Sequence, residues 1–434
     1  MVKPEKVRRA GYAPTNEVGR RGLHTRESIV RGAARLFLDR GFHGTSIEAI
    51  AKAAGGSRAT VYQYFEDKSD IYRELAAQCV PAVVEHAGEL KSLGPDATGI
   101  SNLHRWLDRW TALYDEHAVV LLAFPGLGLS PDIVSGAEDV LNRYLEAVSC
   151  RAREASVEGL VPEDAAAAVV RVAHMVNLYR YRRMWGLPSA SGVTASLTVA
   201  LQLLLFPDTA HTVLEVVRVN ADPPAVADCA RRAALAPAEP PPSVSPIRSD
   251  IVAAGSALFA ERGYYAVSME DIASAANVSR ATLYRHFGTK GAILSELTQW
   301  ALVESAGLAA DLQRLAGRGA TRASMHAWLG HYVRFHRSYG AVIQTWYDGA
   351  LNRQLADAVK ACLGPFQQAA TALLARSGLP EAIDLRVGAA IFLSVLGRMT
   401  DMTMARRSTD SDYDSADLML VVLTRALRLN FVDD

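Results

Sequence analysis

Apolar and polar residues alternate with a helical period along most of the chain. Near the N-terminus, Ile29, Ala33 and Phe37 recur at intervals of four residues, and Gly41 follows where a helix C-terminal cap is expected. The pattern therefore predicts an amphipathic helix from about Arg26 to Arg40.

Two much shorter helices are predicted directly after this one. Ser46 precedes "IEAIAKAA", which ends at a Gly-Gly pair (55–56), and Ser57 is placed to cap "RATVYQYF". A further helix opens at Lys68. Two short helices joined by a tight glycine turn and braced by a longer first helix make a helix-turn-helix.

The same pattern returns 222 residues later. The segment from Thr25 aligns without a gap over the segment from Ile247, and "SRATVYQYF" (57–65) becomes "SRATLYRHF" (279–287). The alignment continues through "HRWLDRWTALYDEHAVVLLAF" (104–124) over "HAWLGHYVRFHRSYGAVIQTW" (326–346). So long a period indicates two duplicated units and not a solenoid.

The turn inside the helix-turn-helix differs between the copies. Asn277 stands in the second turn where the first has Gly55, and Asn tolerates a left-handed backbone. Val278 stands where the first turn has Gly56, which provides no apolar anchor. We therefore expect the third helix of the first unit to be held less tightly.

Composition and charge restrict the function. The chain has 434 residues, half of them hydrophobic, which is enough for several domains. Its 46 basic and 46 acidic residues balance, so any DNA binding must come from a local patch. The four cysteines are scattered, with no C-x-x-C pair, which indicates a reducing cytoplasm and no metal site. We expect no secretory signal, no membrane span and no cofactor.

The repeated segments resemble the DNA-binding domain of the TetR family of bacterial transcriptional regulators. The resemblance is carried by "F…RG…S…I…AAGGSRATVYQYF…K" and its second version, over about 50 residues of each unit. It implies an N-terminal three-helix domain followed by a helical domain that binds a small molecule and dimerises. It also implies a two-fold dimer whose last helices form a four-helix bundle.

The resemblance and the repeat together predict an all-α protein of two tandem units packed as an intrachain pseudo-dimer. "SGVTASLTVALQLLLF" and "SADLMLVVLTRALRL" are the helices expected to pair within the molecule, and association of two such molecules stays open. The expected segments are a flexible basic N-terminal tail (1–24), the first helix-turn-helix domain (25–75), the first helical ligand-binding and dimerisation domain (76–218), a linker rich in Pro and Ala (219–246), the second helix-turn-helix domain (247–297) and the second helical domain (298–434). The basic residues of the tail either add salt-dependent affinity from a disordered end or lie along a groove.

Residues kept in both copies of the nonapeptide suit docking on phosphates, and the altered residues suit base recognition. Gln63 can pair with adenine and Arg285 with guanine in the major groove, unless both are simply solvated helix residues. By the resemblance, Tyr64 and His286 contact the DNA backbone. The predicted DNA-binding residues are Thr45, Ser46, Ser57, Arg58, Thr60, Tyr62, Gln63, Tyr64 and Lys68 in the first unit, and Ser268, Ser279, Arg280, Thr282, Tyr284, Arg285, His286 and Lys290 in the second.

Both helical domains carry aromatic-rich stretches, which suit either a ligand cavity or ordinary core packing. The predicted pocket residues are Trp106, Trp110, Tyr114, His174 and Tyr179 in the first unit, and Trp328, Tyr332, Phe335, Trp346, Phe392 and Met399 in the second. The expected effector is a small apolar or aromatic molecule.

The sequence thus predicts a ligand-responsive DNA-binding regulator, by the family's habit a repressor. It would bind double-stranded DNA at an operator whose two half-sites differ, in the cytoplasm and at the nucleoid when bound. The alternatives are a regulator with only one functional helix-turn-helix, or an architectural DNA-binding protein. The sequence contains no P-loop, dinucleotide-binding, G-x-S-x-G or H-E-x-x-H motif, which argues against an enzyme.

Overall fold

The computed structural model describes residues 17–123, 131–218, 245–346, 349–406 and 412–432, and every regular element in these ranges is a helix. We call α1 to α3 the first head and α4 to α10 the first body; α11 to α13 are the second head and α14 to α18 the second body. None of the helices in the described ranges is long and apolar enough to cross a bilayer.

Each head is built from one longer and two short helices, as the sequence predicted. The first head contains α1 (Glu17–Arg40), α2 (Ile47–Ala53) and α3 (Arg58–Tyr64), and the second contains α11 (Pro246–Arg262), α12 (Met269–Ala275) and α13 (Arg280–His286). Gly41 and Gly55 adopt positive φ, and so does Asn277 at φ 51°, as its turn required. Ser46 caps α2 by accepting a hydrogen bond from the Ala49 N–H at 3.1 Å.

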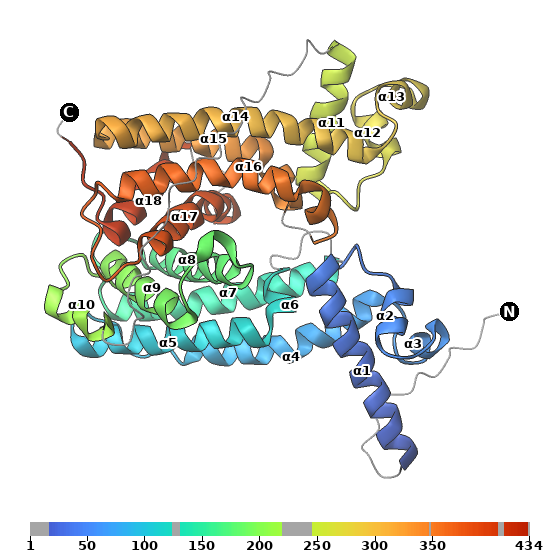
Figure 1. Ribbon diagram of the computed structural model, residues 1–434, viewed down its shortest axis with the longest axis horizontal. Helices are drawn as coiled ribbons and strands as arrows, with labels where there is room; N and C mark the ends of the chain where they lie inside the picture. The colour runs from blue at the N-terminus through green and yellow to red at the C-terminus, as the bar shows by residue number, and fades with distance from the viewer. Residues whose placement is uncertain (1–16, 124–130, 219–244, 347–348, 407–411, 433–434) are drawn as a thin grey trace.

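Helix α1 begins earlier than the sequence pattern predicted. It starts at Glu17 instead of near Arg26, so the segment expected as a flexible tail (1–24) overlaps the helix from residue 17 onward, while residues 1–16 lie outside the described ranges. The apolar periodicity starts only at Ile29, but extending a formed helix costs far less than starting one, so polar residues continue it. In Figure 1 this extension of α1 projects away from the rest of the first head.

The bodies are bundles of longer helices that lie on one side of the heads (Figure 1). The first body contains α4 (Lys68–Gly88), α5 (Ala97–Glu116), α6 (Ala118–Leu121), α7 (Pro131–Glu154), α8 (Pro162–Tyr181), a 3-10 turn (Met184–Gly186), α9 (Ala190–Leu205) and α10 (His211–Arg218). The second contains α14 (Lys290–Arg318), α15 (Arg322–Trp346), α16 (Gly349–Leu374), α17 (Leu385–Arg406) and α18 (Asp412–Leu427). One continuous helix, α15, thus replaces the pair α5 and α6.

The two bodies pack against each other through α8 and α9 of one and α17 and α18 of the other. Every residue of α9 from Gly192 to Leu205 is buried, and so is every residue of α8 from Ala165 to Tyr179 except the half-buried Arg171. A helix that is apolar on all faces must be covered on all faces, and here its own body covers one side and the second body the other. The predicted pairing of 191–206 with 415–429 is confirmed, and the chain is an intrachain pseudo-dimer.

Polar contacts tie the two bodies together around this four-helix interface. The backbone N–H of Asp384 donates to the Ser196 hydroxyl at 3.1 Å, and Arg386 donates to the Gly186 carbonyl at 2.6 Å. At the other end, Arg425 donates to the Glu158 carbonyl at 2.7 Å. A further bond runs from Arg428 to the Pro207 carbonyl. The connecting segment 219–244 lies outside the described residues, and α11 already begins at Pro246, which was expected to be the last linker residue.

Candidate nucleic-acid interface

The third helix of the first head presents a polar face to solvent. Arg58, Tyr62 and Gln63 are exposed, whereas Val61 and Phe65 are buried in the head. Tyr62 keeps half of its surface accessible. The outward face of α3 therefore combines a cation, a phenol and an amide.

The second head repeats this arrangement residue by residue. Arg280, Tyr284 and Arg285 of α13 are exposed, and Leu283 and Phe287 are buried. The Arg280 guanidinium lies over the Tyr284 ring at 5.5 Å and pairs with Glu270 of α12 at 3.0 Å. Both third helices thus expose an arginine and a tyrosine at equivalent positions. The residue after the tyrosine differs, because it is Gln63 in α3 and Arg285 in α13.

Serine caps open both third helices. Ser57 accepts a hydrogen bond from the Thr60 N–H at 3.1 Å, and the Ser57 N–H donates to the Thr60 hydroxyl at 3.4 Å, which makes a capping box. The two hydroxyls lie 3.0 Å apart. Ser279 and Thr282 repeat this contact at 2.9 Å. These hydroxyls therefore hold the helix start, whose positive dipole end favours an anion such as phosphate. Ser46 and Ser268 are exposed caps of the second helices.

Three predicted DNA-binding residues have structural roles. Thr45 is 2% exposed, and its hydroxyl donates to the Gly41 carbonyl at 2.8 Å. The Lys68 ammonium donates to the Phe42 carbonyl at 2.8 Å and lies 4.5 Å from the Phe42 ring. Lys290 makes the equivalent bonds to the Tyr264 and Val267 carbonyls, both at 2.6 Å, and burial lowers its pKa. These side chains brace the loop between the first two helices, so their reach toward DNA is smaller than the sequence suggested.

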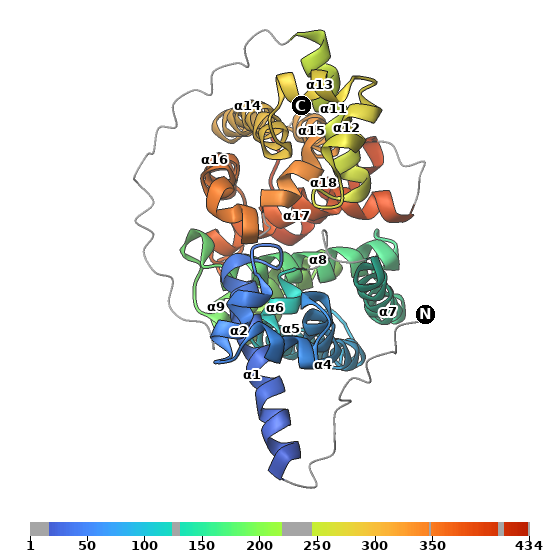
Figure 2. The ribbon, with the colours of Figure 1, turned by 90° about the vertical axis from the view of Figure 1, so that its right-hand side faces the viewer.

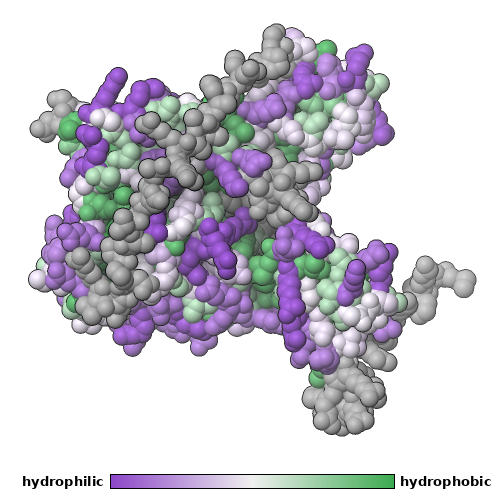
Figure 3. Space-filling view, in the orientation of Figure 1, coloured by the Kyte–Doolittle hydropathy of each residue, from purple (hydrophilic) through white to green (hydrophobic). Residues whose placement is uncertain are grey.

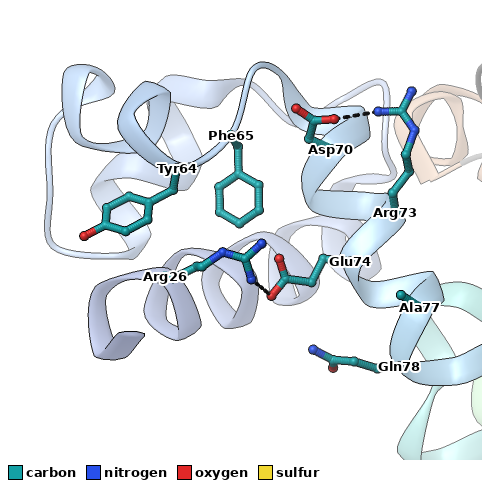
Figure 4. A pocket seen from close by; sticks show the side chains of 8 residues that line it. All are labelled: Arg26, Tyr64, Phe65, Asp70, Arg73, Glu74, Ala77 and Gln78. Atoms are coloured by element: carbon teal, nitrogen blue, oxygen red, sulfur yellow. Dashed lines mark hydrogen bonds and ion pairs between the residues drawn. The ribbon is translucent and has the colours of Figure 1, made fainter. Parts of the chain in front are cut away.

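An ion pair behind each third helix was missed by the sequence analysis. Arg26 of α1 pairs with Glu74 of α4, and its guanidinium lies 4.9 Å from the Phe65 ring. Figure 4 shows this pair in a groove of about 560 Å³ beneath the end of α3, with Tyr64 at its rim. Arg248, Glu296 and Phe287 repeat the arrangement in the second head. The signal was present in the sequence, because Arg26 and Arg248 align in the repeat.

The two third helices lie on the same side of the molecule. In Figure 1 the heads stand side by side at the end of the bodies, and Figure 2 views this end directly. Figure 3 shows hydrophilic residues over the outer surfaces of both heads and a hollow between them. Two helix-turn-helix units that face the same side are a requirement for binding one face of a duplex.

The predicted pocket residues of the first body form a buried aromatic cluster that also includes two residues the sequence analysis did not select. His86 of α4 bonds the Tyr144 hydroxyl at 2.7 Å through Nδ1 and the Trp106 carbonyl at 2.8 Å through Nε2. A carbonyl only accepts, so Nε2 carries the proton, and Tyr144 donates to neutral Nδ1. Burial lowers the pKa of His86 to about 4.

Trp110 completes this cluster, with its ring 5.6 Å from His86 and 5.7 Å from Tyr144. Its indole N–H is buried and has no hydrogen-bond partner within the described residues. Tyr114 and His174 lie beyond it, with ring centroids 5.6 Å apart. Tyr179 is 1% exposed and packs on Trp185 at 4.6 Å. An unsatisfied buried donor is costly, which makes this cluster the better candidate for a ligand site.

The equivalent region of the second body is an apolar core. Leu308 and Phe366 replace His86 and Tyr144, while Trp328 still donates to the Leu308 carbonyl at 2.9 Å, as Trp106 does to His86. Trp328, Tyr332, Phe335, Trp346 and Phe392 are all buried. The side chain of Met399 lies outside the described residues.

Comparisons with known proteins match the two heads. The family described as "Bacterial regulatory proteins, tetR family" matches residues 29–75 and 251–297. The HTH-type transcriptional regulator AcrR of Shigella flexneri is 47% identical over 51 residues, which is 12% of this chain and 24% of AcrR. The transcriptional repressor AcnR of Corynebacterium glutamicum is 30% identical over 80 residues, or 18% of this chain and 38% of AcnR. The chain thus spans about a quarter to two fifths of these relatives.

Among solved structures, the TetR family regulator PfmR from Thermus thermophilus aligns with 40% of this chain and 96% of its own, at 23% identity and a TM-score of 0.35. The two family matches coincide with the two heads described above and with the first turns of α4 and α14. The chain therefore contains two copies of the TetR-family DNA-binding domain, one in each of its two units.

Proposed function

We propose that the protein is a DNA-binding transcriptional regulator that holds one operator with both of its heads. The observation that supports this most directly is the matched outward face of α3 and α13 on one side of a pseudo-dimer. Arg58 with Tyr62, and Arg280 with Tyr284, provide the same exposed pair in both heads. Such a pair docks on phosphates and fixes the position of each helix in the groove.

The two heads read different bases in this proposal. Gln63 in α3 and Arg285 in α13 occupy the same exposed position, and their side chains match adenine and guanine respectively. A dimer of two identical subunits presents the same recognition residues to both half-sites. A chain with two different heads can recognise two half-sites that differ in sequence. We therefore propose an operator whose halves differ at the base facing this position.

We propose that the effector binds in the first body and that its binding moves the first head. The unsatisfied Trp110 N–H suits an aromatic ligand that carries a hydrogen-bond acceptor. Helix α4 has His86 in its last turn and Lys68 at its start, bonded to the loop of the first head. A ligand that displaces the end of α4 would therefore move the head, weaken one half-site and release the operator, as in a repressor.

Selection of bound sites from a random DNA pool tests the proposal with the full-length protein. The expected result is a two-part site of unequal halves. Gln63→Ala should relax base preference in one half and Arg285→Ala in the other, each by about 1–3 kcal/mol. Binding of similar strength to every sequence would instead indicate an architectural protein, and a site with a single selected half would indicate one functional head.

A ligand screen tests the regulatory part separately. Small aromatic compounds with an acceptor atom should quench Trp110 fluorescence and lower operator affinity. A compound that binds at Trp110 without changing operator affinity would contradict the coupling through α4. Trp110→Phe keeps a smaller aromatic ring and removes the N–H, so it tests the proposed hydrogen bond through its effect on the ligand dependence of operator affinity.

A further inference from the structure

The two heads touch each other through the loops that join their first and second helices. The His43 imidazole stacks on the Tyr265 phenol ring, with ring centroids 3.5 Å apart and planes inclined by 12°. Both side chains are half-buried. His43 and Tyr265 occupy the same position in the two copies of the repeat, so this contact lies on the pseudo-two-fold axis that relates the heads.

The stack continues into each head. Phe42 meets the edge of His43 at 5.2 Å, and Tyr264 meets the edge of Tyr265 at 5.2 Å. Phe42 and Tyr264 each pack in turn on a core phenylalanine of their own head. We call Phe42, His43, Tyr265 and Tyr264 the inter-head bridge. It is a continuous series of aromatic contacts from one head core to the other.

Each end of the inter-head bridge is fixed by a lysine. The Lys68 ammonium lies 4.5 Å from the Phe42 ring, and the Lys290 ammonium lies 4.4 Å from the Tyr264 ring. These lysines are the first residues of α4 and α14, which run from the heads into the bodies. The bridge therefore joins the two places at which any movement of the bodies reaches the heads.

We propose that the inter-head bridge sets the separation of α3 and α13 and so determines which half-site spacing the protein accepts. This inference rests on the proposed binding of DNA by both heads. One added base pair moves a half-site by about 3.4 Å and turns it by about 35° around the duplex. Rings in van der Waals contact cannot follow such a change without separating, so the intact bridge matches one spacing.

The bridge is small compared with the four-helix interface of the bodies, so its loss should leave the fold intact. His43→Ala and Tyr265→Ala remove the stack from either side. His43→Tyr places in the first head the residue that the second already has, and Tyr265→Phe keeps the ring without its hydroxyl. The alanine variants test the contact, and the aromatic variants are their matched controls.

The first experiment measures the affinity of the full-length protein for its selected site with zero, one or two base pairs added or removed between the halves. For the unaltered protein we expect a fall of at least about tenfold for one base pair. For the alanine variants we expect a fall of less than about threefold, with base preference inside each half unchanged. The aromatic variants should keep the sharp preference.

The possible outcomes separate the bridge from the proposed function. If the alanine variants keep the same sharp spacing preference, or the aromatic variants lose it, the bridge does not determine the spacing. DNA binding by both heads would be unaffected by that result. If the unaltered protein selects no DNA sequence, the proposed function fails and the spacing role fails with it.

A second measurement needs no DNA. Lys52 and Ser274 are exposed and equivalent, so spin labels at Lys52→Cys and Ser274→Cys report the distance between heads after Cys150→Ser and Cys229→Ser. A narrow distance distribution that broadens in His43→Ala, but not in His43→Tyr, is the expected result. Equal distributions in all three proteins would overturn the proposal.

Discussion

The first body buries a hydrogen-bonded His86 and Tyr144 where the second body places Leu308 and Phe366, whereas the two heads keep the same exposed and buried positions along their third helices. The copies have thus diverged inside the bodies, whereas their third helices differ at three positions. Such a difference is expected if both heads meet the same kind of partner and only one body has to admit a polar ligand.

The heads also differ in how they join their bodies. The apolar core of the first head, around Ile50 and Phe65, forms a cluster of its own. The core of the second head, around Ile272 and Phe287, is continuous with the core of both bodies. The first head is therefore the more independent unit.

Truncation of the central phenylalanine of each head should have the largest effect. Phe65→Ala and Phe287→Ala each remove a ring that is at most 3% exposed, which should cost about 3–5 kcal/mol. Hydrogen exchange should increase in the first head and the start of α4 for Phe65→Ala, but along α14 and into the bodies for Phe287→Ala. Exchange that spreads equally in both variants would contradict the difference between the heads, and Tyr62→Ala, on the exposed face, is the control.

Acid should destabilise the first body and not the second. The pKa of His86 is about 4 in the folded protein and about 6.5 when exposed, so the unfolded chain binds more protons between these values. Stability is therefore full above about pH 6.5 and falls by roughly 3 kcal/mol as the pH drops toward 4.

The double variant His86→Leu with Tyr144→Phe copies the residues of the second body and should remove the part of this pH dependence that comes from His86. His104, whose pKa is also lowered by burial, retains its own contribution. Urea unfolding followed between pH 4 and 7 measures the change. An unaltered pH slope in the double variant would show that another group is responsible.

Gly56→Val should have the smallest effect, and it should be stabilising. Val278 packs on the core at the equivalent position, and a Cβ at Gly56 would meet only Thr60 at an ordinary 3.5 Å. The gain expected is about 0.5–1 kcal/mol. Gly55→Val is the control that should destabilise, because Gly55 has φ +71°. The melting temperatures of the Gly56→Val and Gly55→Val variants show whether the turn of the first head lacks an apolar side chain that packs on the core.

Local patterns predicted most of the heads. The caps at Ser46 and Ser57, the left-handed Asn277 and the helix-turn-helix follow from rules that act within a few residues. The pairing of the last helices was implied by the resemblance of the repeated segments to the TetR family.

Contacts between distant residues were harder to predict. Nothing in the sequence around Lys68 shows that its ammonium is used by the Phe42 carbonyl, so it was taken for a phosphate contact. His86 and Tyr144 are 58 residues apart, and no local motif around either residue indicates that they form a hydrogen bond. The repeat offered a signal for His43 and Tyr265, because equivalent aromatic positions in matching loops meet when a two-fold axis passes between them.

The four-helix interface between the bodies makes pairing of the two units independent of protein concentration. Two separate subunits would come apart when diluted, and a scarce regulator would spend time as half-molecules with one DNA-binding helix each. Here Ser196 and Asp384, on opposite sides of the interface, belong to the same polypeptide. Pairing therefore does not depend on copy number, and even a single molecule in a cell carries both of its heads.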